Sequence, residues 1–199
     1  ISGDKSISHR AILLNSIAIG NSHVSNFCEG DDRESMLRCL RGLGINIVKH
    51  YSCSVTKDDE CFYIEGRGYE PLDKPATVLN AGNSGTTMRL TTGLLAAQPF
   101  SSVITGDSSL RNRPMLRIVD PLTQMGASIT GRSDRTLAPL AINGNTLTGI
   151  KYEMPIPSAQ VKSAILLSAL NTPGITEIKV EKNSRDHTEN LLKTINADI

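Results

Sequence analysis

The strongest constraint on the fold is an order of predicted elements that recurs along the chain. The segments 43–47, 125–129 and 195–199 each carry a helix end, a turn residue and the start of a strand. Their turn residues, Gly44, Gly126 and Asn196, are 82 and 70 positions apart. Glycine and asparagine accept the left-handed backbone that ends many helices. This spacing predicts a unit of strand, helix, strand, helix, strand and strand that occurs about three times.

Local patterns place the elements inside each unit. Apolar runs at 11–14, 88–97 and 161–170 predict the first helices, and Asp31, Arg113 and Ser184 lie where the second helices are predicted to begin. We expect a turn at 20–22. We expect strands at 23–27, 45–48, 51–57, 61–65, 76–79, 101–105, 127–130, 140–143, 149–153 and 176–180. The units would cover 1–70, 71–154 and 155–199. The third would break off before its last two strands, so we expect a single domain that is cut short.

Composition excludes several classes of function. The 199 residues are enough for a buried core, and 39% apolar with 21% charged residues is typical of a globular protein. A net charge of +1 and only 4% aromatic residues argue against a nucleic-acid partner. The sequence has no apolar run near 18 residues, so we expect no membrane span.

The four cysteines do not predict a metal site. Cys28, Cys39, Cys53 and Cys61 form no C-x-x-C pair and have no accompanying histidine cluster. Cys53 and Cys61 could face each other across a hairpin. Because no secretory signal is visible, however, we expect reduced thiols and a cytoplasmic protein.

Polar and charged residues gather where the predicted helices begin. The first helices begin near Lys5-Ser6, Asn83–Thr86 and Ser158–Gln160, and the second begin near Asp31–Arg33, Arg111–Arg113 and Ser184-Arg185. A helix start exposes unpaired N–H groups and the positive end of the dipole, which favours anions. Each cluster alone is compatible with an ordinary capped helix. If rotation relates the units, the clusters converge on one anion-binding face.

Four segments resemble the signature segments of the 5-enolpyruvylshikimate-3-phosphate (EPSP) synthase family, the shikimate-pathway enolpyruvyl transferases. They are G-D-K-S-I-S-H-R (3–10), L-N-A-G-N-S-G-T-T-M-R-L (79–90), G-D-S-S-L-R-N-R-P-M (106–115) and P-S-A-Q-V-K-S-A (157–164). The resemblance implies an inside-out α/β fold of βαβαββ units with pseudo-threefold symmetry, helices inside and sheets outside. It also implies that the second domain of the enzyme is missing.

The resemblance also implies a reaction and a set of site residues. The family transfers the enolpyruvyl group of phosphoenolpyruvate to the 5-hydroxyl of shikimate 3-phosphate, releasing phosphate, without a metal or organic cofactor. Lys5 matches the lysine that touches both substrates and is the catalytic candidate. The residues matching the shikimate 3-phosphate site are Lys5, Ser6, Arg10, Ser158, Ala159, Gln160, Ser184 and Arg185. Those matching the phosphoenolpyruvate site are Lys5, Asn83, Gly85, Arg113 and Gln160.

The chain departs from the family pattern in places. Ser2 stands where the motif begins with Pro, Ala159 replaces a Ser of one branch, and S-G-T-T-M follows Asn83. These departures leave the response to the family's inhibitor glyphosate open, not the reaction. Because the family's acid and base carboxylates lie in the other domain, we expect little activity from this chain alone.

Several polar residues near the motifs are assigned structural roles. We expect Arg89 to be a buried ion-pair partner and His9 to be a satisfied or exposed histidine and not a base. Thr86 and Thr87 are candidate helix caps. Asp31, Asp32, Asp107 and Asp120 are likewise interpreted as structural.

Two alternatives remain at the level of sequence. One is a non-catalytic module that binds anions or RNA ends on the same repeated scaffold, because fold does not settle function. The other is the UDP-sugar enolpyruvyl transferase, which carries Asn after its early lysine and a catalytic Cys loop. Here Ser6 follows Lys5, and the loop of the second unit has no Cys.

Overall fold

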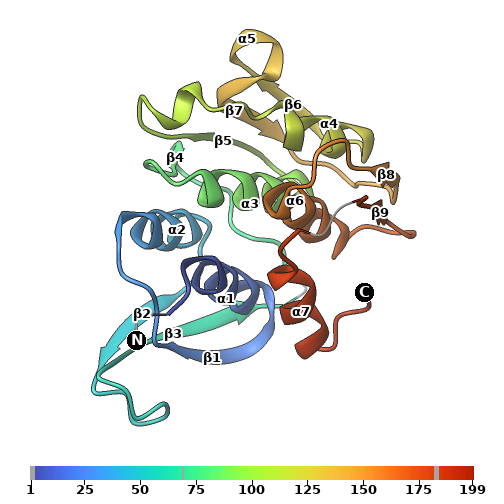
Figure 1. The fold of residues 1–199 in the computed structure, drawn as a ribbon. Helices are drawn as coiled ribbons and strands as arrows, with labels where there is room; N and C mark the ends of the chain where they lie inside the picture. Colours follow the sequence, from blue (N-terminus) through green and yellow to red (C-terminus); the bar gives the residue numbers. More distant parts are fainter. Residues whose placement is uncertain (1–2, 69, 182–183) are drawn as a thin grey trace.

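A computed structural model describes residues 3–68, 70–181 and 184–199 (Figure 1). The first part of the chain forms α1 (Lys5–Ile17), β1 (Ile19–Ser25), α2 (Asp31–Gly42), β2 (Ile47–Tyr51) and β3 (Glu60–Arg67). The helices α1 and α2 lie against one face of the sheet, which has the strand order β1-β3-β2 and is antiparallel throughout (Figure 1).

The middle of the chain repeats this arrangement with an extra first strand. It forms β4 (Leu79–Asn80), α3 (Gly85–Ala96), β5 (Ser101–Thr105), a 3-10 turn (Leu110–Asn112), α4 (Leu116–Gln124), β6 (Ser128–Gly131), the four-residue α5 (Arg132–Arg135) and β7 (Leu137–Asn143). The sheet order is β4-β5-β7-β6, with β4 parallel to β5 and the other pairs antiparallel.

The last part of the chain begins the same pattern again. It forms β8 (Lys151–Glu153), α6 (Ala159–Ala169), β9 (Glu177–Lys179) and α7 (His187–Thr194), and β8 pairs with β9 in parallel as β4 does with β5. The order β1-β3-β2 likewise matches β5-β7-β6. Sheet topology therefore confirms an α/β fold in which the same arrangement recurs along the chain.

The helices form the interior and the sheets lie outside (Figure 1). Two central helices, α3 and α6, approach closely, since a Cβ on Gly93 would lie 2.8 Å from Ala164 Cα. The Ser168 hydroxyl donates to the Gly93 carbonyl across the same crossing, at 2.6 Å. Glycine in mid-helix is thus required by packing, and it holds the second and third repeats together.

Two sequence predictions in the first repeat are wrong. Residues 20–22 continue β1 and do not form a turn, because they pair with residues 64–66 of β3. Residues 52–59 form a loop and not a strand, because Ser52 and Lys57 adopt positive φ angles of 59°. The extended run therefore ends at Tyr51.

Element boundaries differ elsewhere. Of the strand expected at 76–79 only Leu79 is extended, and β4 has two residues. The helix expected from Arg113 begins at Leu116, because Arg113 is extended, with φ −84° and ψ 139°. The helix expected from Ser184 begins at His187.

The cysteines also differ from expectation. Cys53 and Cys61 form a disulfide across the β2–β3 hairpin, with Cα atoms 5.8 Å apart. The expectation of reduced thiols was therefore wrong for this pair, because the hairpin brings the two side chains together. Cys28 and Cys39 are free and buried. No helix among the described residues has the length and apolar character to cross a bilayer.

Candidate anion-binding site

Three helix starts in the three repeats are capped in the same way. The side chains of Asp4, Ser84 and Ser158 each accept a hydrogen bond from the backbone N–H three residues later, at 2.9, 3.1 and 3.4 Å. Each cap satisfies one of the four free N–H groups of its helix and leaves others available. The predicted cap of α3 at Thr86 or Thr87 was wrong, because Ser84 occupies the cap position.

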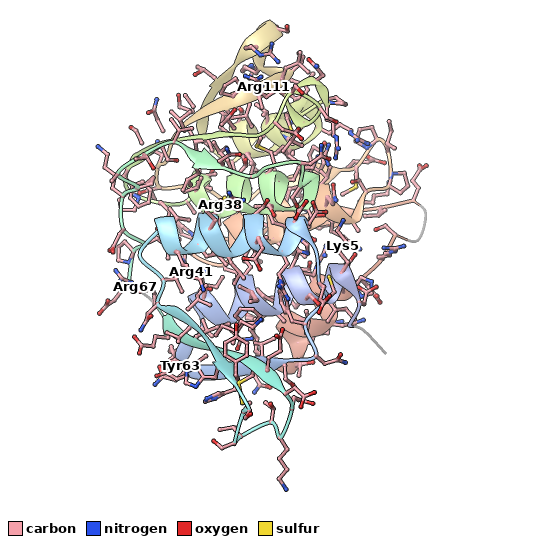
Figure 2. All side chains as sticks on the ribbon, turned by 90° about the vertical axis from the view of Figure 1, so that its left-hand side faces the viewer. Lys5, Arg38, Arg41, Tyr63, Arg67 and Arg111 are labelled. Atoms are coloured by element: carbon pink, nitrogen blue, oxygen red, sulfur yellow. A yellow bond between two sulfur atoms is a disulfide. The ribbon has the colours of Figure 1, made fainter. Side chains whose placement is uncertain are left out.

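Lys5 lies at the first position of α1, beside the start of α2 (Figure 2). Its ammonium group forms an ion pair with the carboxylate of Asp32, and the Lys5 side chain is 58% exposed. The Asp32 carbonyl faces His9 Nε2 at 3.2 Å and accepts from Thr87 Oγ1 at 3.5 Å. Asp32 therefore joins the starts of α1, α2 and α3. Sequence reasoning missed this contact, and the only signal was the acidic pair opening the second helix.

His9 is buried and not exposed. Its Nδ1 lies 2.7 Å from the Lys5 carbonyl and its Nε2 lies 3.2 Å from the Asp32 carbonyl, and because a neutral ring carries one N–H, it donates to only one of these two acceptors. Burial lowers the pKa of His9 below its ordinary value, although the nearby Lys5 and Asp32 carbonyls partly oppose the shift. The ring is therefore neutral near pH 7 and closed to solvent.

Arg10 joins helices of the first and third repeats. It is 3% exposed and donates to Thr188 Oγ1 at 2.6 Å, to Ser163 Oγ at 2.8 Å and to the Ser6 carbonyl at 3.0 Å. Burial lowers the pKa of this guanidinium. Of its five N–H donors, three are used within the protein and two remain.

Ser6, Arg185 and Ser184 lie around the same end of the molecule. Arg185 donates to Ser6 Oγ at 3.5 Å, so the first and third repeats also meet here. The hydroxyl of Ser184 is buried and has no hydrogen-bond partner among the described residues. An unpaired buried hydroxyl is costly, so this group is available to a ligand.

A second set of residues surrounds Arg113. Its guanidinium donates to Asn83 Oδ1, and Asn83 Nδ2 donates to Asp107 Oδ2 at 2.6 Å. Asp107 Oδ1 accepts from the Leu110 N–H at 2.7 Å. These bonds, first that of Leu110 and then that of Asn83, lower the pKa of Asp107. The carboxylate therefore stays charged and holds the Asn83–Arg113 pair in place.

Gly85 brings the backbone against two cations. A Cβ at this position would lie 2.9 Å from one terminal nitrogen of Arg89 and 3.4 Å from one of Arg113. The missing side chain therefore leaves the first N–H groups of α3 next to two guanidinium groups. This is the close approach that an anion site at a helix start requires.

Arg89 is a residue that sequence reasoning misassigned. It donates to Gln160 Oε1 at 2.6 Å and to the Pro114 carbonyl at 3.3 Å. Within residues 3–68, 70–181 and 184–199, no carboxylate forms a salt bridge with it, so the expected ion pair is wrong. Burial first, and then Arg117 and Arg113, lower its pKa.

Gln160 connects the second and third repeats. Its Nε2 donates to Thr86 Oγ1 at 3.0 Å, while its Oε1 faces Arg89. Ser158 and Ala159 precede it as the cap and first residue of α6. The first turns of α6 therefore contact two clusters of residues. Gln160 reaches the cluster around Arg89 and Arg113, and Ser163 reaches the cluster around Arg10, Ser6 and Arg185.

The arrangement is a cationic face built from helix starts. Two basic residues of α2, Arg38 and Arg41, lie toward its far end, away from Lys5 (Figure 2). Among the residues that the structure describes, no group of three His, Cys, Asp or Glu side chains could hold a metal ion. Chemically, the face can bind phosphate or carboxylate groups and stabilise negative charge near Lys5.

Comparisons with known proteins agree with one another. The sequence model of EPSP synthase (3-phosphoshikimate 1-carboxyvinyltransferase) matches residues 1–199. The enzyme named 3-phosphoshikimate 1-carboxyvinyltransferase from Pelotomaculum thermopropionicum is 49% identical over 199 residues, covering 100% of this chain and 44% of the relative. The enzyme of that name from Geotalea uraniireducens is 50% identical over the same length, covering 45% of the relative.

A solved structure shares the fold. EPSP synthase from Acinetobacter baumannii superposes with a TM-score of 0.90 at 44% identity, over 97% of this chain and 42% of that chain. The present chain thus spans less than half the length of the relatives that it matches.

Proposed function

The chain belongs to the EPSP synthase family, and we propose on that premise that it forms one half of a 3-phosphoshikimate 1-carboxyvinyltransferase. The reaction adds the 5-hydroxyl of shikimate 3-phosphate across the double bond of phosphoenolpyruvate, with the oxygen on C2 and a proton on C3. The tetrahedral adduct then loses phosphate from C2 and a proton from C3, which restores the double bond. The main support for the proposal is that two arginine-containing clusters meet at the start of α6. Arg10 contacts Ser163 of this helix and Arg89 contacts Gln160.

One set fits shikimate 3-phosphate. Ser6, Arg10 and Arg185 offer a hydroxyl and two guanidinium groups within one hydrogen-bonded cluster. A guanidinium can hold a carboxylate or phosphate with two parallel bonds. Ser158, Ala159, Gln160 and Ser184 complete this set from the third repeat.

The other set fits phosphoenolpyruvate. Arg113 and Asn83 lie beside the open backbone of Gly85, where a phosphate can reach the first N–H groups of α3. Gln160 reaches this set through Arg89. Lys5 lies at the start of α1 and would stabilise charge on the reacting oxygen once a substrate displaces Asp32.

The domain organisation is part of the proposal. We interpret residues 1–199 as one domain with units at 1–70, 71–154 and 155–199, the last truncated, which closes on a second domain to complete the active site. The cytoplasmic location also stays a prediction. Because half of the catalytic groups would come from the other domain, the chain alone should bind its substrates weakly and turn over little.

An NMR titration of the 199-residue chain tests the proposal. We expect millimolar shikimate 3-phosphate to shift the amide signals of Lys5, Ser6 and Ser158. Phosphoenolpyruvate should shift those of Gly85 and Arg113. Signals that do not move with either compound would refute the assignment.

Two further measurements delimit the function. Enolpyruvyl transfer by the chain alone, at the rate of a full-length relative, would contradict the need for a second domain. Salt-dependent binding of single-stranded RNA would instead favour a module that binds RNA ends.

A further inference from the structure

Arg89 is an unusual cation within this site. It lies on α3 and is partly buried; this burial, and then the neighbouring Arg117 and Arg113, lower its pKa, and no described carboxylate neutralises it. Burying a charge costs free energy unless hydrogen bonds or an opposite charge compensate it. The contacts that Arg89 makes should therefore explain why the position holds an arginine.

The first of these contacts determines how the amide of Gln160 is oriented. A guanidinium only donates hydrogen bonds, so the amide atom that faces it at 2.6 Å must be the oxygen. The nitrogen then points the other way and donates to the hydroxyl of Thr86 at 3.0 Å. If the amide were turned over, two donors would face each other at Arg89. The charge of Arg89 therefore excludes the turned-over orientation.

The second contact, with the Pro114 carbonyl, holds the Arg89 guanidinium in place. The other terminal nitrogen donates to the carbonyl of Pro114 at 3.3 Å, in the segment that carries Arg113. The guanidinium is thus held between α6 and that segment. A planar fork can hold both acceptors at once, whereas an ammonium group cannot reproduce that geometry.

We propose that Arg89 is a positioning residue, which fixes the Gln160 amide so that the site meets its anionic ligand with an N–H donor. One Nε2 hydrogen binds Thr86, and the second remains for a phosphate or carboxylate oxygen. With the amide reversed, Gln160 would present a carbonyl oxygen that repels the same anion. Gln160 also lies in the first turn of α6, where the helix dipole favours negative charge. The inference rests on the proposed function for the identity of the ligand, but not for the orientation of the amide.

A ligand-free measurement tests the orientation. In the 199-residue chain labelled with 15N, the side-chain NH2 signals of Gln160 should be shifted from those of free glutamine and slow to exchange. Arg89→Met should move these signals toward free glutamine, because methionine donates no hydrogen bond. Arg89→Lys keeps a charged donor without the fork and should move them less. Arg38→Met is the matched control, since Arg38 is exposed on α2 and the hydrogen bond of its side chain that the described residues show goes to Ser35 of the same helix, at 3.5 Å. Unchanged Gln160 signals in folded Arg89→Met would overturn the proposal.

A double-mutant cycle tests the consequence for binding, with phosphoenolpyruvate as the probe. Arg89→Met should weaken binding about tenfold, in keeping with loss of a charge-assisted hydrogen bond. In the Gln160→Ala background the same change should have little further effect. Fully additive effects would show that Arg89 contacts the anion independently, which would also overturn the proposal.

The two measurements separate this inference from the proposed function. If the chain binds no phosphoenolpyruvate, the proposed function fails for this chain while the Gln160 signals still decide the orientation. If it binds but the cycle is additive, the proposed function stands and the positioning role fails. Thermal unfolding of each variant confirms that the comparison is made between folded proteins.

Discussion

At the scale of single residues, charged neighbours orient both amides of the site. The Asp107 carboxylate can only accept hydrogen bonds, so it binds the amide nitrogen of Asn83. The amide oxygen of Asn83 therefore faces Arg113. The Arg89 guanidinium can only donate hydrogen bonds, so it binds the amide oxygen of Gln160. The groups offered to a ligand are therefore fixed before the ligand arrives, which reduces the entropy cost of binding.

Arg10 should be important for stability as well as for binding. Arg10→Met would remove the guanidinium that donates to Thr188, Ser163 and the Ser6 carbonyl in a buried region. We expect a loss of about 2–4 kcal/mol in the free energy of unfolding, measured by urea denaturation. Arg38→Met, on the surface of α2, should change it by less than about 0.5 kcal/mol. Equal values for the two variants would contradict the structural role of Arg10.

His9 should make stability depend on pH. Its folded-state pKa lies below its ordinary value near 6.5, so the unfolded chain binds the proton first as the pH falls. The stability contributed by neutral His9 is therefore complete above that ordinary value and is lost as the pH drops below it. Urea midpoints between pH 7.5 and 5 should fall more steeply for the wild type than for His9→Gln. Parallel slopes for the two proteins would rule out this contribution.

At the scale of elements, the packing of α3 on α6 is the tightest constraint. Both helices begin with site residues, so their crossing determines how far Gly85 lies from Gln160. The contact uses the bare backbone of Gly93 and the hydrogen bond from Ser168. A change in the crossing would therefore disturb the site without touching any residue in it.

Gly93→Ala should be strongly destabilising. The added Cβ would lie 2.8 Å from Ala164 Cα, and closer still to the Ala164 carbonyl, so backbone must move. Overpacking of this kind costs about 1–3 kcal/mol, visible as a lower thermal midpoint. Gly42→Ala is the matched control, because its Cβ would meet only the flexible tip of Leu79, at 3.0 Å. A Gly93→Ala protein as stable as Gly42→Ala would show that the helices can separate freely.

At the scale of the whole molecule, the site lies where the repeats meet, and the hairpin that carries the disulfide projects from the outer sheet of the first repeat (Figure 1). Arg10 links α1 to α6 and α7, and Arg89 links α3 to α6. Binding groups therefore depend on assembly of all three repeats, whereas the hairpin is a local feature of one.

Thiol chemistry should show that the disulfide hairpin is independent of the binding groups between the repeats. Denatured without reductant, the chain should expose two reactive thiols, Cys28 and Cys39, and four after reduction. In the folded protein neither free thiol should react quickly, because both are buried and burial raises the pKa of Cys39 to about 12. Reduction should lower the free energy of unfolding by about 2–3 kcal/mol, because the loop is short. It should leave the NMR shifts caused by phosphoenolpyruvate unchanged, and changed shifts would contradict the separation.

The sequence by itself determined the repeat, the motif positions and the neighbourhood of each helix start. Turn glycines and apolar runs act over a few positions and located these features, whereas the caps of α1 and α3, Asp4 and Ser84, and the first residues of α4 and α7 were seen only in the structure. Tertiary structure decided the partners. Asp32 meets Lys5 and Arg89 meets Gln160 only because helix packing brings distant segments together. Such contacts depend on side-chain geometry and burial, which no local pattern encodes. For this reason the sequence predicted an anion-binding face, and only the fold showed how its arginines and amides are held.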